Sequence, residues 1–131
     1  VRPELPAEGA AENFTGLDRE CERVLRDDPS SDVAWFLLGA TGGGMTITGA
    51  SQCECYERAL TLNPEFSEGW FNLGVNGGGT VRGAYNSKVE CYERALSLDP
   101  GDSVGWLNLG TQGGGTVAGV GRSETQCYGM P

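Results

Sequence analysis

The residue types that could do chemistry in this chain are five cysteines, several closely spaced carboxylates and three runs of three glycines. Cys55, Cys91 and Cys127 recur every 36 residues, and Cys53 forms a C-x-C pair with the first of them. Thiolates of this kind could bind zinc, paired carboxylates could transfer protons, and glycine-rich loops could bind anions through backbone N–H groups. Histidine is absent, which excludes mechanisms that need an imidazole as base, nucleophile or metal ligand.

The segments around these residues repeat every 35 or 36 positions. WFNLG at 70–74 has counterparts at 35–39 and 106–110, and YERAL at 56–60 returns at 92–96. The glycine triplets at 42–44, 77–79 and 113–115 follow the same period, and Pro29, Pro64 and Pro100 each precede a tryptophan by six residues. Such a period is typical of repeat architectures, in which each unit buries its apolar face against a neighbour.

Each repeat is predicted to contain two helices. Trp70, Leu73 and Gly74 lie on one face of a first helix, whose glycine allows a second helix to approach closely. The glycine triplet ends this helix, and a loop is expected from 77 to 86. Capping boxes then mark the start of the second helix at Ser51–Glu54, Ser87–Glu90 and Ser123–Gln126. The second helix ends before proline, because the residue preceding proline avoids helical geometry.

The repeated set resembles the tetratricopeptide repeat, which has Trp, Leu-Gly, an aromatic residue, Ala and Pro in the same order at a period of 34. The resemblance covers residues 16–128, and the extra length of this chain falls between the two helices of a repeat. It implies an all-α fold, a short right-handed solenoid of antiparallel helix pairs. Sel1-like repeats have a similar glycine-bearing loop but lack this phasing of Pro and Trp.

The predicted organisation is a mobile acidic segment at 1–13 followed by one helical repeat domain at 14–131. A half repeat spans 14–29 with a helix at 16–27, full repeats span 30–64 and 65–100, and a truncated repeat spans 101–131. The last repeat is short because Cys127 and Tyr128 are followed by Gly, Met and Pro.

The resemblance also implies a peptide-binding groove lined by the first helix of each repeat. The positions one and two after each tryptophan carry over as groove residues: Phe36, Leu37, Phe71, Asn72, Leu107 and Asn108. The groove asparagine of the family falls on Asn72 and Asn108, whereas Leu37 departs from it. An amide can donate to and accept from a peptide backbone. Packing between units is the alternative role for Phe36 and Phe71.

Each chemical hypothesis has a structural alternative that we favour. Cysteines one repeat apart would lie ~10 Å from one another, too far to share a metal ion or a disulfide, so buried thiols are expected. Glu54 and Glu90 have capping roles, while Glu57 and Glu93 lie on an outer helical face. The glycine triplets lack a following Gly-Lys-Ser/Thr, so tight turns with positive φ are expected rather than phosphate loops. The valines at 81 and 117 and Ile47 are expected to pack each loop against the helices.

The charge balance restricts the partners. The chain has 18 acidic and 9 basic residues in 131, a net charge of −9, which disfavours nucleic acid and anionic membranes. Residues 1–33 are the most densely acidic; a basic partner is possible there, and a solvated acidic face is favoured. No leader segment or membrane-length apolar run is evident, and five thinly spread cysteines fit reduced thiols in the cytoplasm. Because the chain starts at Val1, a processed product or an excised fragment is expected.

The function that the resemblance implies is a non-catalytic scaffold that binds a peptide or protein segment in its groove, without metal or cofactor. Two other roles stay open. The chain could be a structural spacer or a fragment of a larger repeat-containing enzyme, or it could self-associate through its truncated C-terminal repeat.

Overall fold

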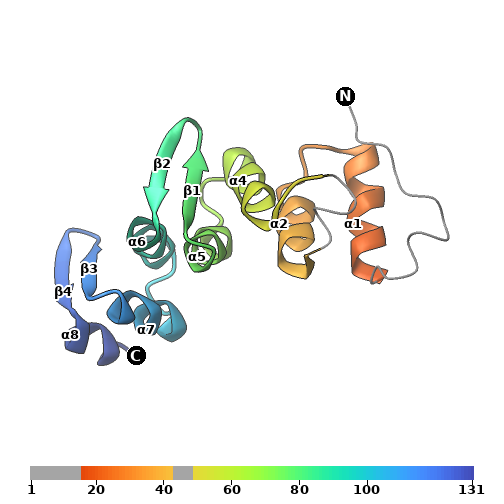
Figure 1. Ribbon diagram of the computed structural model, residues 1–131. Coiled ribbons are helices and arrows are strands. Elements are labelled where there is room, and N and C mark those ends of the chain that lie inside the picture. Colours follow the sequence, from red (N-terminus) through yellow and green to blue (C-terminus); the bar gives the residue numbers. More distant parts are fainter. Residues whose placement is uncertain (1–15, 43–48) are drawn as a thin grey trace. The chain divides into compact units, whose positions relative to one another are not determined.

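The computed structural model describes residues 16–42 and 49–131, and these are mostly helical, with seven helices and two antiparallel β-hairpins (Figure 1). The segment predicted to be mobile, 1–13, lies outside the described residues. The chain divides into two units, one ending at Asn63 and the other beginning at Pro64. Each unit has a hydrophobic cluster of its own.

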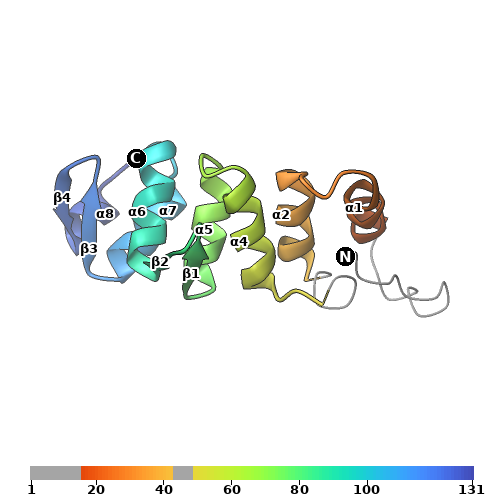
Figure 2. The ribbon, with the colours of Figure 1, turned by 90° about the horizontal axis from the view of Figure 1, so that it is seen from above.

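The first unit contains α1 (Gly16–Asp27), α2 (Asp32–Thr41) and α4 (Gln52–Leu62), and α2 lies between the other two (Figure 2). Local sequence fixes the helix ends. The side chain of Ser31 accepts a hydrogen bond from the N–H of Ala34 at the start of α2, and Gly42 ends that helix with φ of 78°. The core of this unit includes Cys21, Leu25, Trp35, Leu38, Cys55 and Ala59.

The second unit contains α5 (Ser67–Val75), α6 (Lys88–Leu98), α7 (Ser103–Thr111) and the five-residue α8 (Glu124–Tyr128). Helix α6 packs against α5 and α7, and α7 packs against α8. The three predicted capping boxes, one at α4 in the first unit and two at α6 and α8, are all formed. The predicted helix positions are therefore confirmed for the residues that the structure describes.

The prediction of an all-α chain is wrong between the helices of the second unit. Instead of a loop at 77–86, β1 (Gly78–Val81) pairs with β2 (Ala84–Ser87), and β3 (Gly114–Val117) pairs with β4 (Val120–Ser123). Both pairs are antiparallel hairpins that project from the helices they connect (Figure 1). Val81 and Val117 are buried where β1 and β3 contact the helices, as predicted; Ile47 lies outside the described residues.

Two-residue turns with positive φ explain why these segments form hairpins. Arg82 and Gly83 have φ of 51° and 82°, and Ala118 and Gly119 have φ of 51° and 80°. Turns with two positive φ values match the right-handed twist of the paired strands. The sequence signal was an X-Gly pair preceded by Thr-Val, which is weaker than the usual Asn-Gly or Asp-Gly turn.

The second and third glycine triplets have the predicted positive φ at their first two residues. Gly77 and Gly78 have φ of 100° and 96°, and Gly113 and Gly114 have φ of 97° and 94°. At Gly78 a side chain would also collide with the backbone oxygen of Asn86 on the paired strand. In the first triplet, Gly42 has positive φ, and positions 43 and 44 lie outside the described residues.

A close contact between a glycine and a tyrosine ring joins the two helices of each pair. A β-carbon added to Gly74 would lie 2.8 Å from Cε1 of Tyr92 and 3.1 Å from Cβ of Cys91. The corresponding distances to tyrosine Cε1 are 2.8 Å for Gly39 and Tyr56, and 2.7 Å for Gly110 and Tyr128. The prediction that this glycine allows close helix approach is confirmed in all three pairs.

We predict that Gly74→Ala destabilises the fold by about 1–2 kcal/mol, because the clash with Tyr92 outweighs the better helix propensity of alanine. Urea denaturation followed by circular dichroism measures the change. Gly101→Ala is the control, since an added β-carbon there meets only a carboxylate oxygen at 3.7 Å. Equal stability of the two variants would contradict the close-packing role.

Candidate functional site

A tryptophan anchors the start of the first helix of each pair. In α5 the indole Nε1 of Trp70 donates a hydrogen bond of 2.7 Å to the carbonyl oxygen of Pro64. Trp106 makes the same bond to Pro100 at 2.8 Å, and in the first unit Trp35 makes it to Pro29 at 3.0 Å. The constant spacing of six residues between proline and tryptophan therefore reflects a hydrogen bond that closes the turn before the helix.

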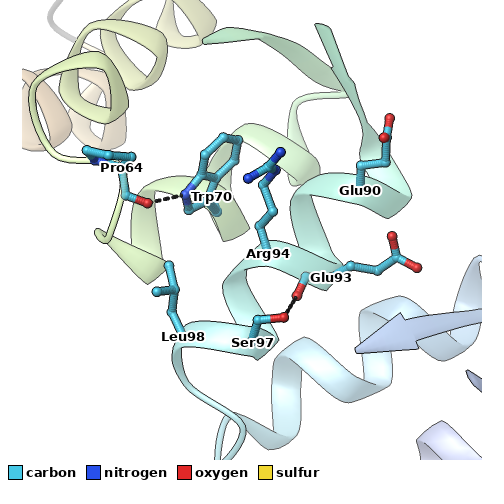
Figure 3. Close-up of a pocket in the computed structure, with 7 residues that line it drawn as sticks. All are labelled: Pro64, Trp70, Glu90, Glu93, Arg94, Ser97 and Leu98. Carbon is cyan, nitrogen blue, oxygen red and sulfur yellow. Dashed lines mark hydrogen bonds between the residues drawn. The ribbon is translucent and has the colours of Figure 1, made fainter. Parts of the chain in front are cut away.

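An arginine guanidinium lies over the ring of each of these buried tryptophans. The guanidinium carbon of Arg94 lies 5.0 Å from the ring centroid of Trp70 (Figure 3). The Nε of Arg94 donates a 2.8 Å bond to Oδ1 of Asn86. Asn86 is only 3% exposed and is the one buried polar side chain among the described residues. Because a buried amide needs partners, Asn86 and Arg94 fix each other's orientation.

The third repeat reaches the same arrangement from a different element. Arg122, on β4, lies 5.0 Å from the ring of Trp106 and occupies the strand position that Asn86 occupies in β2. Met130 stands where the other repeats have Arg58 and Arg94. Sequence analysis missed the roles of Asn86 and Arg122. The role of Arg122 follows from the hairpin register, in which Arg122 pairs with Gly115, and the sequence analysis did not predict these strands.

A pocket of about 380 Å³ opens beside the Trp70–Arg94 stack. It is lined by seven residues from α5, α6 and the preceding turn (Figure 3): Pro64, Trp70, Glu90, Glu93, Arg94, Ser97 and Leu98. Its polar groups already have partners within the second unit. Oε2 of Glu93 accepts a 2.6 Å bond from the N–H of Thr116, and the Ser97 hydroxyl donates to the carbonyl oxygen of Glu93.

Glu90 is engaged in the same way. Its carboxylate accepts a 2.9 Å bond from the N–H of Ser87, which completes the capping box. The hydrogen bonds from Ser87 lower the pKa of Glu90, since they stabilise the ionised form. Glu90 and Glu93 therefore have the structural roles of a helix cap and a tie to β3.

The six predicted groove residues fall into two sets. Phe36 and Leu37 lie on α2 in the first unit, and the other four lie on α5 and α7 in the second: Phe71, Asn72, Leu107 and Asn108. Phe36 packs on Tyr56 with ring centroids 5.7 Å apart, and Phe71 packs on Tyr92 at 5.8 Å. Leu37 packs against the core of the first unit. Half-buried packing thus accounts for three of the six residues.

The remaining three residues face outward on neighbouring repeats. Leu107 is 52% exposed, and Asn72 and Asn108 are half-buried. Neither asparagine side chain forms a hydrogen bond with another described residue; only their backbone carbonyls accept bonds, from Asn76 and Thr111. Phe71 packs against the cluster that contains Trp106 and Leu109, so α5 and α7 contribute to one core. We call the surface formed by Asn72 on α5 and by Leu107 and Asn108 on α7 the α5–α7 face.

None of the five cysteines forms a disulfide. Cys21, Cys55, Cys91 and Cys127 are buried and Cys53 is half-buried, as the buried-thiol hypothesis predicted for the repeating position. Burial raises the pKa of Cys55 to about 11, which keeps this thiol protonated. Among residues 16–42 and 49–131, no cluster of three or more potential metal ligands occurs.

No helix within the described part of the chain is both long and apolar enough to cross a membrane. Comparison with protein-family models and with curated proteins finds no match for this chain. The interpretation of the α5–α7 face therefore depends on its own geometry.

We predict that Arg94→Met destabilises the protein by about 1–3 kcal/mol, since it removes the stacking on Trp70 and leaves the buried Oδ1 of Asn86 without its partner. Arg58→Met is the matched control. Arg58 stacks on Trp35 at 4.6 Å, but Ala50 stands at the position of Asn86, so only the stacking is lost. Urea denaturation should show the larger loss for Arg94→Met, and equal losses would exclude a structural role for Asn86.

We also predict that iodoacetamide at pH 8 alkylates Cys53 before the other described cysteines, because the other four thiols are buried. Mass spectrometry of tryptic peptides after short labelling times measures the order. Labelling in urea is the control, since all thiols should then react. Faster labelling of Cys55 in the native protein would contradict its burial.

Proposed function

We propose that this chain is a repeat protein of the tetratricopeptide type, in which antiparallel helix pairs stack as a short right-handed solenoid and act as a non-catalytic scaffold for an extended peptide. Three in-phase features support this proposal: the Trp–Pro hydrogen bonds, the capping boxes and the glycine–tyrosine contacts. The hairpins are compatible with it, since they occupy the connections and leave α5 and α7 continuous.

The observation that carries the proposal is the pair of amides at Asn72 and Asn108. They lie at equivalent positions 36 residues apart, and neither has a side-chain partner among the described residues. An amide side chain offers one acceptor and two donors, so each can bind both the C=O and the N–H of a peptide backbone. Two amides on neighbouring repeats can therefore hold an extended chain without selecting its side chains.

The apolar part of this surface is smaller than the family resemblance implies. The rings of Phe36 and Phe71 each pack against a tyrosine of the same repeat, which reduces the apolar surface that they can offer to a peptide. Leu107 is the most exposed of the predicted groove residues. We therefore propose that the peptide binds to Asn72, Leu107 and Asn108. Phe71 packs α5 against the core of the second unit and holds that helix in position.

The test is selection of peptides from a random phage-displayed dodecapeptide library on the immobilised full-length chain. Selected peptides are then synthesised with a fluorescent label, and their affinity is measured by fluorescence anisotropy. We expect the double variant Asn72→Ala/Asn108→Ala to bind roughly ten-fold more weakly, which corresponds to the loss of about 1.4 kcal/mol from two or more hydrogen bonds.

Ser97→Ala is the control variant, because it removes a polar side chain from the surface of α6 rather than from α5 or α7. Both variants should keep the far-UV circular dichroism of the parent chain. Failure of the library to yield any binder, or equal affinity for the parent and the double variant, would refute the proposal.

A further inference from the structure

Neither α5 nor α7 contains a basic residue. The basic residues of the second unit lie in the first hairpin turn, on α6 and on β4: Arg82, Lys88, Arg94 and Arg122. Two of them stack on the tryptophans, and each tryptophan precedes its asparagine by two residues. Two residues correspond to about 200° around an α-helix, so the stacked guanidinium groups lie on the far side from the amides.

The α5–α7 face itself combines amides with apolar groups and one negative charge. Val104 precedes Asn108 by one helical turn and is 56% exposed, and Leu107 is the adjacent exposed residue. The equivalent of Val104 on α5 is Glu68, which is exposed and is the only charged residue in either helix. The side chains that α5 and α7 offer on this face are therefore amides, aliphatic groups and a carboxylate, and neither helix contains a basic residue.

We propose that the α5–α7 face selects peptides with an aliphatic or aromatic side chain beside Val104 and Leu107, and that it rejects acidic segments. This inference rests on the proposed function. A ligand carboxylate near Val104 and Leu107 would lose hydration without gaining a cationic partner, and Glu68 together with the net charge of −9 would repel it. An apolar side chain would instead bury surface that Val104 and Leu107 leave exposed.

The test uses the same selected dodecapeptides. We expect them to be enriched in apolar residues and depleted in Asp and Glu relative to the unselected library. In the tightest binder, replacing its essential apolar residue by Asp should weaken binding to the parent chain at least ten-fold, as measured by anisotropy. Val104→Lys supplies the missing cation and should reduce that ratio to less than three-fold.

Val120→Lys is the matched control. Val120 is 50% exposed, but it lies on β4, so a lysine there should leave the penalty for Asp unchanged. Acidic binders that still require Asn72 and Asn108 would overturn this inference while leaving the proposed function intact. Loss of the Asp penalty in both lysine variants would also overturn it, because the effect would then come from net charge alone. Absence of any binder would instead refute the proposed function.

Discussion

The contact between a glycine on one helix and a tyrosine ring on the next is the constraint on which the rest of the structure depends. In each pair, a β-carbon on the glycine would approach the ring to 2.8 Å or less. The ring can approach the first helix this closely only because the glycine has no side chain, and this sets the distance between the helices. Cys55, Cys91 and Cys127 are buried beside these rings for the same reason: a small thiol fits where a larger side chain would separate the helices.

The orientation of the first helix follows from a second set of contacts. The Trp–Pro hydrogen bond closes the preceding turn, and an arginine guanidinium lies over the indole ring. Because these contacts occupy one side of α5 and α7, the opposite side remains available. Asn72 and Asn108 lie there, and their side-chain amides form no hydrogen bond with another described residue, which is the physical basis of the peptide-binding proposal.

Much of the helical structure could be predicted from sequence because its signals are local. In the capping boxes, Ser51, Ser87 and Ser123 each form hydrogen bonds with the residue three positions further on, and the glycine triplets mark helix ends. The hairpins could not be predicted with the same rules. Arg82 and Ala118 adopt positive φ against their intrinsic preference. Val81 and Val117, next to these turns, are buried, and β1 packs on α5 and α6 while β3 packs on α6, α7 and α8, so the hairpins depend on tertiary contacts with the helices.

The sequence by itself determined the helix starts, since each capping box joins residues three positions apart, and the period, since the same residue types recur every 35 or 36 positions. The same repetition marked the glycines at which helices approach, although each of them contacts a tyrosine 17 or 18 residues further along the chain. Only the tertiary structure decided which side chains of the first helices stay exposed and which are packed against a neighbouring element. Phe71 has the same spacing from tryptophan as Leu107, yet Phe71 packs on Tyr92 whereas Leu107 stays exposed. Likewise, Arg122 replaces Arg94 over an indole because strand pairing carries it to a place that a helix reaches in the preceding repeat. Burial of this kind depends on neighbours far along the chain, and no local pattern encodes it.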